Sequence, residues 1–265
     1  SEENQATIEV PVETTLNFEK AYGVNVKEVE NINNPDEYLF DSFVNSTGQV
    51  VESGFVISTN INDTVIYGSS TVENTVNGGI ANDTVITGIA DDTIFGNEGD
   101  DIITSGLGDD TVDGGEGNDT LDFSSIDNQN PLGITANLED GTVIGDGTDE
   151  VSNIENVIGT QDNDILIGDD EDNILKGEAG IDILKGNDGD DTLEGGSGDD
   201  TIEGGLGDDL LKGDTGIDTV SYENAISSTD DGVTVNLEDN SSNPGIGSAS
   251  GIDGVDILYD FENIT

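Results

Sequence analysis

The sequence predicts an all-β fold, a parallel solenoid in two arrays that are separated and capped by related β inserts. Three observations lead to this prediction. A unit of nine residues repeats along the chain, each unit carries one aliphatic residue at the same position, and the residues between are rich in Gly and Asp. A helix needs apolar residues every three or four positions and does not tolerate this much glycine, so short strands joined by turns fit better.

The composition excludes several classes of function. The chain has 265 residues, with 60 Asp and Glu, five Lys, no Arg and a formal net charge of −55. This charge argues against binding to nucleic acid or to an anionic membrane, and no apolar run is long enough to span a bilayer. Because the chain has no Cys and no His, disulfides, the usual zinc sites and Ser-His-Asp triads are excluded. Acid-rich chains are often disordered, but the regular placement of the apolar residues predicts a folded protein.

The nine-residue unit is clearest in "GGSGDDTIE" (195–203), whose residues define positions one to nine. Position six is acidic, or Asn once, in twelve units: Asp83, Asp92, Asp101, Asp110 and Asp119, then Asp164, Asn173, Asp182, Asp191, Asp200, Asp209 and Asp218. Position eight is aliphatic in the same twelve units: Val85, Ile94, Ile103, Val112, Leu121, Leu166, Leu175, Leu184, Leu193, Ile202, Leu211 and Val220. Position four is Gly in five consecutive units: Gly180, Gly189, Gly198, Gly207 and Gly216.

This period predicts the local structure. A strand of about three residues points one side chain inward, at position eight, and a turn of about six residues follows it, with glycines supplying the positive φ angles. Two such units make one coil of 18 residues, and coils stack about 4.8 Å apart. Position-six carboxylates that are 18 residues apart therefore lie side by side along each edge of the solenoid.

Stacked carboxylates need a cation. Two of them about 5 Å apart repel by roughly 3 kcal/mol at an effective dielectric constant of 20. The turns offer only hard oxygen ligands, carboxylates and carbonyls, which suit calcium, whereas magnesium usually keeps several waters. We therefore expect one Ca²⁺ between each pair of stacked turns.

Three segments, "GGEGNDTLD" (114–122), "GGSGDDTIE" (195–203) and "GGLGDDLLK" (204–212), resemble the G-G-x-G-x-D-x-U-x nonapeptide of the repeats-in-toxin (RTX) family. The resemblance implies a parallel β-roll that binds calcium between its turns, and export by a type I secretion system without a cleaved N-terminal signal. It also implies eight calcium sites between these pairs: Asp83 with Asp101, Asp92 with Asp110, Asp101 with Asp119, Asp164 with Asp182, Asn173 with Asp191, Asp182 with Asp200, Asp191 with Asp209, and Asp200 with Asp218.

These sites are expected to differ in quality. Asn173 replaces the carboxylate of position six, and Ile181 and Ile217 occupy position five, where Asp or Asn is usual. Before the first array, Asp63 and Asn74 are eleven residues apart, so the register slips and a site there is not expected.

Related inserts follow the arrays. "GITANLED" (133–140) and "GVTVNLED" (232–239) lie 99 residues apart and alternate like strands. We therefore expect an N-terminal β region or cap at 1–54, a first array with a degenerate start at 55–122, a β insert at 123–158, a second array at 159–221 and a β insert or cap at 222–265.

The ends of the chain suggest continuation. The chain begins with Ser1, which predicts a processed or excised N-terminus. It stops at "FENIT", and the related "IENVIGT" leads directly into the second array, so we expect another array after Thr265. The ends would then be held by caps or by a copy of the chain stacked end to end.

The function expected from these features is not catalytic. We expect a structural tract of a secreted or cell-surface protein, such as an adhesin, a surface-layer protein or a matrix fibre, with calcium ions, copies of itself or other surface components as partners. The alternatives are the calcium and secretion module of an exoenzyme or toxin, and an enzyme that uses carboxylate pairs on glycosidic bonds. An ice-binding face of stacked Thr84, Thr93, Thr111 and Thr120 is a further alternative, which Ile102 interrupts.

Overall fold

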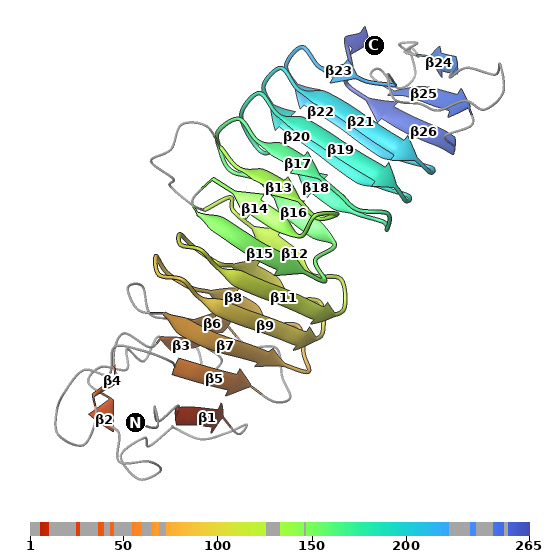
Figure 1. Ribbon diagram of the computed structural model, residues 1–265. Coiled ribbons are helices and arrows are strands. Elements are labelled where there is room, and N and C mark those ends of the chain that lie inside the picture. Colours follow the sequence, from red (N-terminus) through yellow and green to blue (C-terminus); the bar gives the residue numbers. More distant parts are fainter. Residues whose placement is uncertain are drawn as a thin grey trace. The chain divides into compact units, whose positions relative to one another are not determined.

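The protein is an assembly of short strands. The computed structural model describes residues 6–10, 25–26, 37–39, 43–44, 55–59, 65–68, 73–125, 133–145, 147–222, 234–236, 246–251 and 254–265. These residues contain strands and turns and no helix, which confirms the predicted all-β class (Figure 1). Across the same residues, no helix of membrane-spanning length and hydropathy is found.

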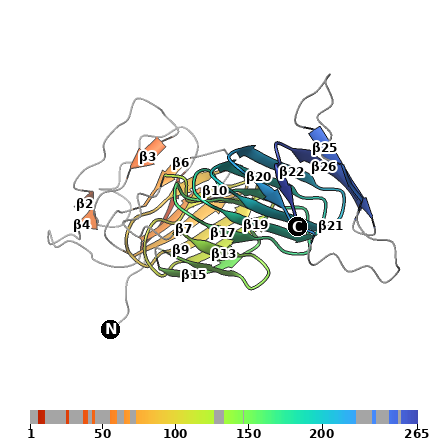
Figure 2. The same cartoon turned by 90° about the horizontal axis from the view of Figure 1, so that it is seen from above.

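The chain forms two compact units, Ser1–Asp122 with Asp146–Ile154, and Phe123–Gly145 with Glu155–Thr265. The first unit has two layers of parallel strands (Figure 2). One layer contains, in spatial order, β1 (Ala6–Val10), β5 (Phe55–Thr59), β7 (Asn74–Gly79), β9 (Thr93–Glu98), β11 (Thr111–Glu116) and β15 (Thr148–Ser152). The other contains β3 (Glu37–Leu39), β6 (Val65–Tyr67), β8 (Thr84–Ile86), β10 (Ile102–Thr104) and β12 (Thr120–Asp122). A separate antiparallel pair joins β2 (Asn25–Val26) and β4 (Phe43–Val44).

The second unit has the same two-layer design. One layer runs β14 (Thr142–Ile144), β13 (Thr135–Asn137), β17 (Ile165–Ile167), β19 (Ile183–Asp188), β21 (Thr201–Leu206), β23 (Thr219–Val220) and β27 (Asn263–Ile264). The other runs β16 (Asn156–Ile158), β18 (Ile174–Lys176), β20 (Thr192–Ser197), β22 (Leu210–Thr215), β26 (Gly254–Tyr259), β25 (Ile246–Gly251) and β24 (Thr234–Asn236). Antiparallel pairing occurs between β13 and β14, between β24 and β25, and between β25 and β26.

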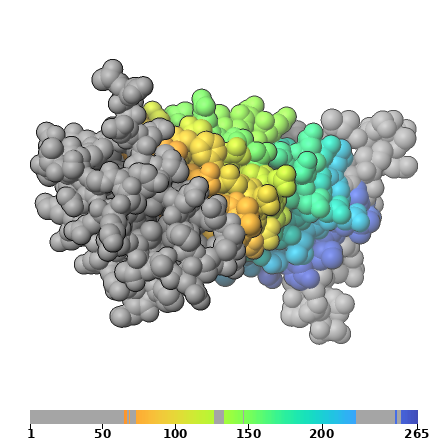
Figure 3. Space-filling view, turned by 90° about the horizontal axis from the view of Figure 1, so that it is seen from below, coloured from red at the N-terminus to blue at the C-terminus, as the bar shows by residue number. Residues whose placement is uncertain are grey.

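The register confirms a coil of two nonapeptides. In β19 and β21, for example, Leu184 pairs with Ile202, 18 residues later, and Leu193 pairs with Leu211 in the opposite layer. All twelve aliphatic residues of position eight are at most 1% exposed. They form the core between the two layers of each unit, while the outward side chains form the surface seen in Figure 3. The core is thin, because most strands contribute one large apolar side chain to it.

Several strands are longer than the three residues predicted. β9, β11 and β19 to β22 have six residues each, and run through position three of the unit. The reason is that the backbone of the turn also pairs with the coil above it, as between Asn187 and Gly205. Gly198 shows how tightly these turns stack: its φ is +148°, and a methyl group on it would lie 1.4 Å from the carbonyl oxygen of Gly180. Only Gly fits there.

The threonines considered for an ice-binding face do not form one column. Thr93 and Thr111 are neighbours on β9 and β11, whereas Thr84 and Thr120 belong to the opposite layer, on either side of Ile102. The reason is the 18-residue coil, which places alternate units on alternate layers. The structure therefore gives two short columns on different faces.

The inserts contribute strands to the arrays. β13 and β24 occupy equivalent places in the related segments 133–140 and 232–239. β15 joins β11 in parallel with Val151 opposite Val112, and β26 joins β22 in parallel with Leu258 opposite Leu211. Most of the predicted N-terminal region 1–54 lies outside the described residues, and the division into five segments stays a prediction.

Candidate metal columns

The position-six side chains form columns along the edges of each unit. Each side chain immediately precedes a strand, as Asp200 precedes β21. All eleven aspartates predicted as calcium ligands are at most 2% exposed: Asp83, Asp92, Asp101, Asp110, Asp119, Asp164, Asp182, Asp191, Asp200, Asp209 and Asp218. Carboxylates are almost never buried this completely without a compensating partner.

In ten of these eleven carboxylates, one oxygen accepts from a backbone N–H. The N–H of Asp182 donates to Oδ1 of Asp200, 18 residues later, at 2.8 Å. All eight predicted pairs are brought together by the same contact, at 2.6–2.9 Å. Among the weaker candidates, Asn74 lies in a column and donates to Asp92, whereas Asp63 lies outside the described residues. The pairs are therefore adjacent, and their metal occupancy stays a prediction.

Among the residues that the structure describes, the other oxygen lacks a donor in six of these carboxylates, whereas Oδ2 of Asp164 accepts from the N–H of Thr160 at 2.6 Å and Oδ2 of Asp92 accepts from the N–H of Gly88 at 3.3 Å. Within the described residues, the Oδ2 atoms of six column aspartates are buried and have no hydrogen-bond partner: Asp101, Asp182, Asp191, Asp200, Asp209 and Asp218. Leaving a buried polar atom unsatisfied costs about 1–3 kcal/mol, and more if the group is charged. A fold that repeats this cost along its edges requires a partner at each of these oxygens.

For Asp101, Asp182 and Asp191, this Oδ2 faces a carbonyl oxygen of the next coil. A methyl group on Gly186, at position one, would lie 2.0 Å from Oδ2 of Asp191 and 2.3 Å from the carbonyl oxygen of Gly204. Gly96 repeats the arrangement, with Oδ2 of Asp101 at 2.2 Å and the carbonyl oxygen of Gly114 at 2.3 Å. Two electron-rich oxygens thus converge where glycine leaves out a side chain, and a cation is the group that stabilises such a contact.

Hard oxygen donors of this kind fit Ca²⁺. Among the described residues, no three carboxylates gather closely enough to hold a metal by side chains alone. Carbonyl oxygens must therefore complete each ligand set. In the best-formed sites the donors would be Oδ2 of one aspartate, the carbonyl oxygen of position one in the next coil, and the carboxylate of that coil.

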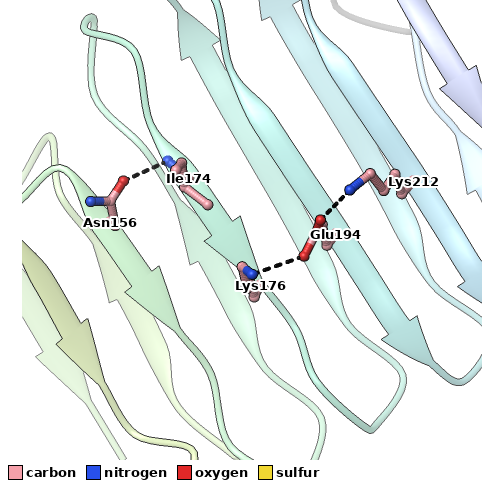
Figure 4. A network of polar contacts seen from close by, with 5 residues as sticks. All are labelled: Asn156, Ile174, Lys176, Glu194 and Lys212. Carbon is pink, nitrogen blue, oxygen red and sulfur yellow. Dashed lines mark hydrogen bonds and ion pairs between the residues drawn. The ribbon is translucent and has the colours of Figure 1, made fainter.

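The three lysines that the structure describes pair with glutamates outside the columns. Within the described residues, Lys176 and Lys212 both pair with Glu194, which lies between them on the outward face of β18, β20 and β22 (Figure 4). Lys185 pairs with Glu203 at 3.4 Å in the same way. Burial raises the pKa of the Glu194 carboxyl, but its hydrogen bonds to Lys212 and Lys176 outweigh burial and lower the pKa overall. Lys176, Lys185 and Lys212 all lie at position nine of their units, where they pair with glutamates outside the metal columns.

Several column aspartates have a raised pKa when no metal is bound. Burial, followed by the negative charges of Asp164 and Asp200, raises the pKa of Asp182 to about 7 against a hydrogen bond that lowers it. Burial likewise raises the pKa of Asp191 and Asp209 to about 7, and that of Asp101 and Asp218 to about 6. Protons and calcium thus compete for the same oxygens near neutral pH.

Acid is therefore expected to stabilise the calcium-free protein. The folded-state pKa of these carboxyls lies above the unfolded value of about 3.9, so the folded state binds more protons between these values. The stabilisation of the calcium-free folded state by these protonated carboxyls is fully present below about pH 4, and it is lost as the pH rises through 6 to 7. Protein freed of calcium by dialysis should show more β structure by circular dichroism at pH 5 than at pH 7.5. Loss of structure on this acidification would contradict the prediction, and saturating calcium should reduce the difference.

Position five forms a second ladder beside the columns. The N–H of Asp190 donates to Oδ1 of Asp172, and the N–H of Asp208 donates to Oδ1 of Asp190. Ile181 donates its N–H to Asn163, but its own side chain offers no acceptor to the next coil. The predicted weakness of the site at Ile181 thus has a physical basis, because one hydrogen bond of the position-five ladder is missing there.

Replacing this isoleucine should strengthen the ladder. Ile181→Asn places an acceptor opposite the N–H of Asp199 without adding charge, and little apolar burial is lost because Ile181 is 57% exposed. We expect a gain of about 0.5–1.5 kcal/mol, the net worth of one hydrogen bond. Urea unfolding in saturating calcium measures this change, with Ile80→Asn, at position three, as the control. A less stable Ile181→Asn variant would contradict this account of the ladder.

Sequence reasoning missed three column residues. The N–H of Asp110 donates to Oδ1 of Asp149 at 2.9 Å, and the N–H of Asp209 donates to Oδ1 of Asp256 at 3.3 Å. The N–H of Asp218 donates to Oε2 of Glu262 at 2.8 Å. A signal was present, since "GTDEV" (147–151) and "GVDIL" (254–258) both match positions four to eight of the repeat. They escaped notice because they lie 39 and 47 residues from their partners, outside the nine-residue register.

The comparison with protein families agrees with this site. The RTX calcium-binding nonapeptide repeat matches in four copies, at residues 73–94, 86–121, 152–184 and 185–220. A search of curated proteins found no match. The fold search matched the crystal structure of the extracellular lipase LipA from Serratia marcescens, with 17% identity and a TM-score of 0.31. That match covers 78% of this chain and 43% of the lipase chain. Residues 73–121 and 152–220 are RTX calcium-binding nonapeptide repeats.

Proposed function

We propose that the chain is a calcium-dependent structural tract of a secreted or cell-surface bacterial protein. The observation that carries the proposal is the stacking of buried Oδ2 atoms against carbonyl oxygens along the edges of both units. An array that repeats this contact is unstable without cations and becomes a stiff, continuous ladder with them. The supported role of the repeats is structural, and the proposal assigns no catalytic residue to them.

Calcium then acts as a folding signal tied to location. Extracellular calcium modules bind with dissociation constants of about 10⁻⁴–10⁻³ M, far above cytosolic calcium concentrations. Before export, the column carboxylates would repel each other and the thin core would not hold the coils together. After export, calcium would fold the chain and stiffen it. This behaviour suits a load-bearing tract such as part of an adhesin, a surface layer or a matrix fibre.

Limited proteolysis across a calcium series tests the proposal. An unfolded chain is cut throughout, whereas a folded solenoid exposes few cleavable segments. We expect rapid digestion at submicromolar calcium and protection of a fragment spanning residues 73–222 between about 10⁻⁴ and 10⁻³ M. Magnesium at equal concentration is the control and should protect less, because it dehydrates reluctantly and usually keeps several waters. Equal resistance in chelator and in calcium would overturn the proposal.

A further inference from the structure

Part of the C-terminal insert takes the place of a repeat in the second unit. β26 pairs in parallel with β22, and Leu258 stands opposite Leu211. Leu258 is 1% exposed, like the aliphatic residues at position eight. Residues 254–258 therefore occupy positions four to eight of a nonapeptide, although they lie beyond the last residue matched by the family repeat.

The contacts of this turn reproduce those of a repeat. A methyl group on Gly254 would lie 1.8 Å from the carbonyl oxygen of Gly207, a clash of the kind seen between coils at position four. The N–H of Val255 donates to Oδ1 of Asp208, which continues the position-five ladder. Asp256 accepts from the N–H of Asp209, so it stands where the next position-six aspartate would stand. It is 3% exposed, whereas an ordinary surface carboxylate would face solvent.

The opposite edge of the unit is continued by the same insert. Glu262 accepts from the N–H of Asp218, as a position-six carboxylate does elsewhere. A methyl group on Gly213 would lie 2.5 Å from the carbonyl oxygen of Asp260 and 2.8 Å from Oδ2 of Asp218. That Oδ2 belongs to a fully buried side chain and has no hydrogen-bond partner within the described residues. It faces the carbonyl oxygen of Asp260 as the column oxygens face their glycine carbonyls.

Tyr222 fixes one of the new carboxylates. Its hydroxyl donates to Oδ2 of Asp256 at 2.8 Å. The neighbouring Oδ2 of Asp209 is buried and has no hydrogen-bond partner within the described residues. The Tyr222 hydroxyl therefore orients the Asp256 carboxylate, which lies beside Asp209.

We propose that residues 254–262 form a further calcium-binding coil of the second unit. Asp256 and Glu262 are its ligands, one on each edge, and Tyr222 is a positioning residue. This inference rests on the proposed function, and extends it to residues that the repeat pattern does not include. The first unit offers a parallel, because Asp149 of the other insert accepts from the N–H of Asp110 and a methyl group on Gly147 would lie 1.7 Å from the carbonyl oxygen of Gly108.

Counting bound ions tests the assignment of ligands. Equilibrium dialysis against ⁴⁵Ca²⁺ should show one ion fewer per chain in Asp256→Asn and one fewer in Glu262→Gln than in the unaltered chain. Asp260→Asn is the matched control, because it removes the same charge from the same coil but keeps the carbonyl oxygen, and it should keep the full count. Both variants binding as many ions as the unaltered chain would overturn the inference.

Terbium luminescence tests the site beside Tyr222 separately. Tyrosine sensitises bound Tb³⁺ only at short range, and the chain has no Trp and five Tyr. Tyr222→Phe should keep the ion count but lower the Tb³⁺ emission excited through tyrosine, while emission from directly excited Tb³⁺ stays unchanged. Asp256→Asn should lower both kinds of emission. Full sensitised emission in both variants would contradict the site.

The outcomes separate this inference from the function on which it rests. If the unaltered chain binds no calcium, the proposed function itself fails. If the unaltered chain binds calcium and Asp200→Asn loses ions, while Asp256→Asn and Glu262→Gln lose none, only the further coil is refuted.

Discussion

Removal of calcium is expected to abolish the folded state at neutral pH. The core contains little more than one aliphatic side chain per strand, and the column carboxylates repel one another when no cation lies between them. Eight sites at ten times their dissociation constant would each contribute about 1.4 kcal/mol, or roughly 11 kcal/mol together. This matches the whole stability of a typical domain, about 5–15 kcal/mol. In excess chelator at pH 7.5, the β-sheet circular dichroism and the cooperative melting transition should both disappear.

Two controls make the chelation experiment specific. Adding calcium in excess of the chelator should restore the signal, which excludes irreversible damage. Adding sodium chloride at matched ionic strength should restore little of it, because screening weakens repulsion between exposed charges more than between buried ones. An unchanged spectrum and melting temperature in chelator would show that the carboxylate columns need no ion.

Asp200→Ala is expected to cause a large loss of calcium-dependent stability. Asp200 contacts two neighbours in its column, accepting from the N–H of Asp182 and donating its own N–H to Asp218. Its loss should remove ligands from two adjacent sites, a cost of about 3 kcal/mol at ten times the dissociation constant. The measurement is urea unfolding in calcium, repeated at several calcium concentrations.

The matched control for this substitution is Asp170→Ala. Asp170 belongs to the same array and carries the same charge, but it is exposed and lies at position three of its turn. Its loss should change the stability by less than about 0.5 kcal/mol, the usual range for surface substitutions. The difference between the variants should grow as calcium rises, because only Asp200→Ala removes binding. Equal losses at all calcium concentrations would mean that position six does not hold the metal.

The sequence alone was sufficient to predict most of the arrays. An 18-residue coil follows from the nine-residue period, because one inward side chain per unit leaves two units to enclose a core. The 18-residue period correctly predicts that Leu184 lies against Ile202 and that Asp182 lies beside Asp200. It works because each coil contacts mainly its neighbours, so local periodicity determines the packing.

Prediction failed where the period is broken. Asp149 and Asp256 take position-six places, but 21 and 29 extra residues (39 − 18 and 47 − 18) separate them from the register. Insertions of this length leave the stacking intact, since β15 still pairs with β11 and β26 with β22, but a search for fixed spacing cannot detect them. Glu262 was missed for another reason, since its longer side chain reaches the column from a segment without the repeat pattern. The six-residue strands depend on backbone pairing between turns, which no side-chain pattern reports.

Anomalous diffraction from crystals grown in calcium would locate the bound ions. We expect anomalous peaks in rows along the edges of each unit, with a peak in contact with Oδ2 of Asp182, the carbonyl oxygen of Gly195 and the carboxylate of Asp200. The same kind of peak should recur at Asp191 with Asp209 and at Asp101 with Asp119. A folded protein in millimolar calcium with no anomalous density at these oxygens would contradict the account, as would ions held only by exposed carboxylates.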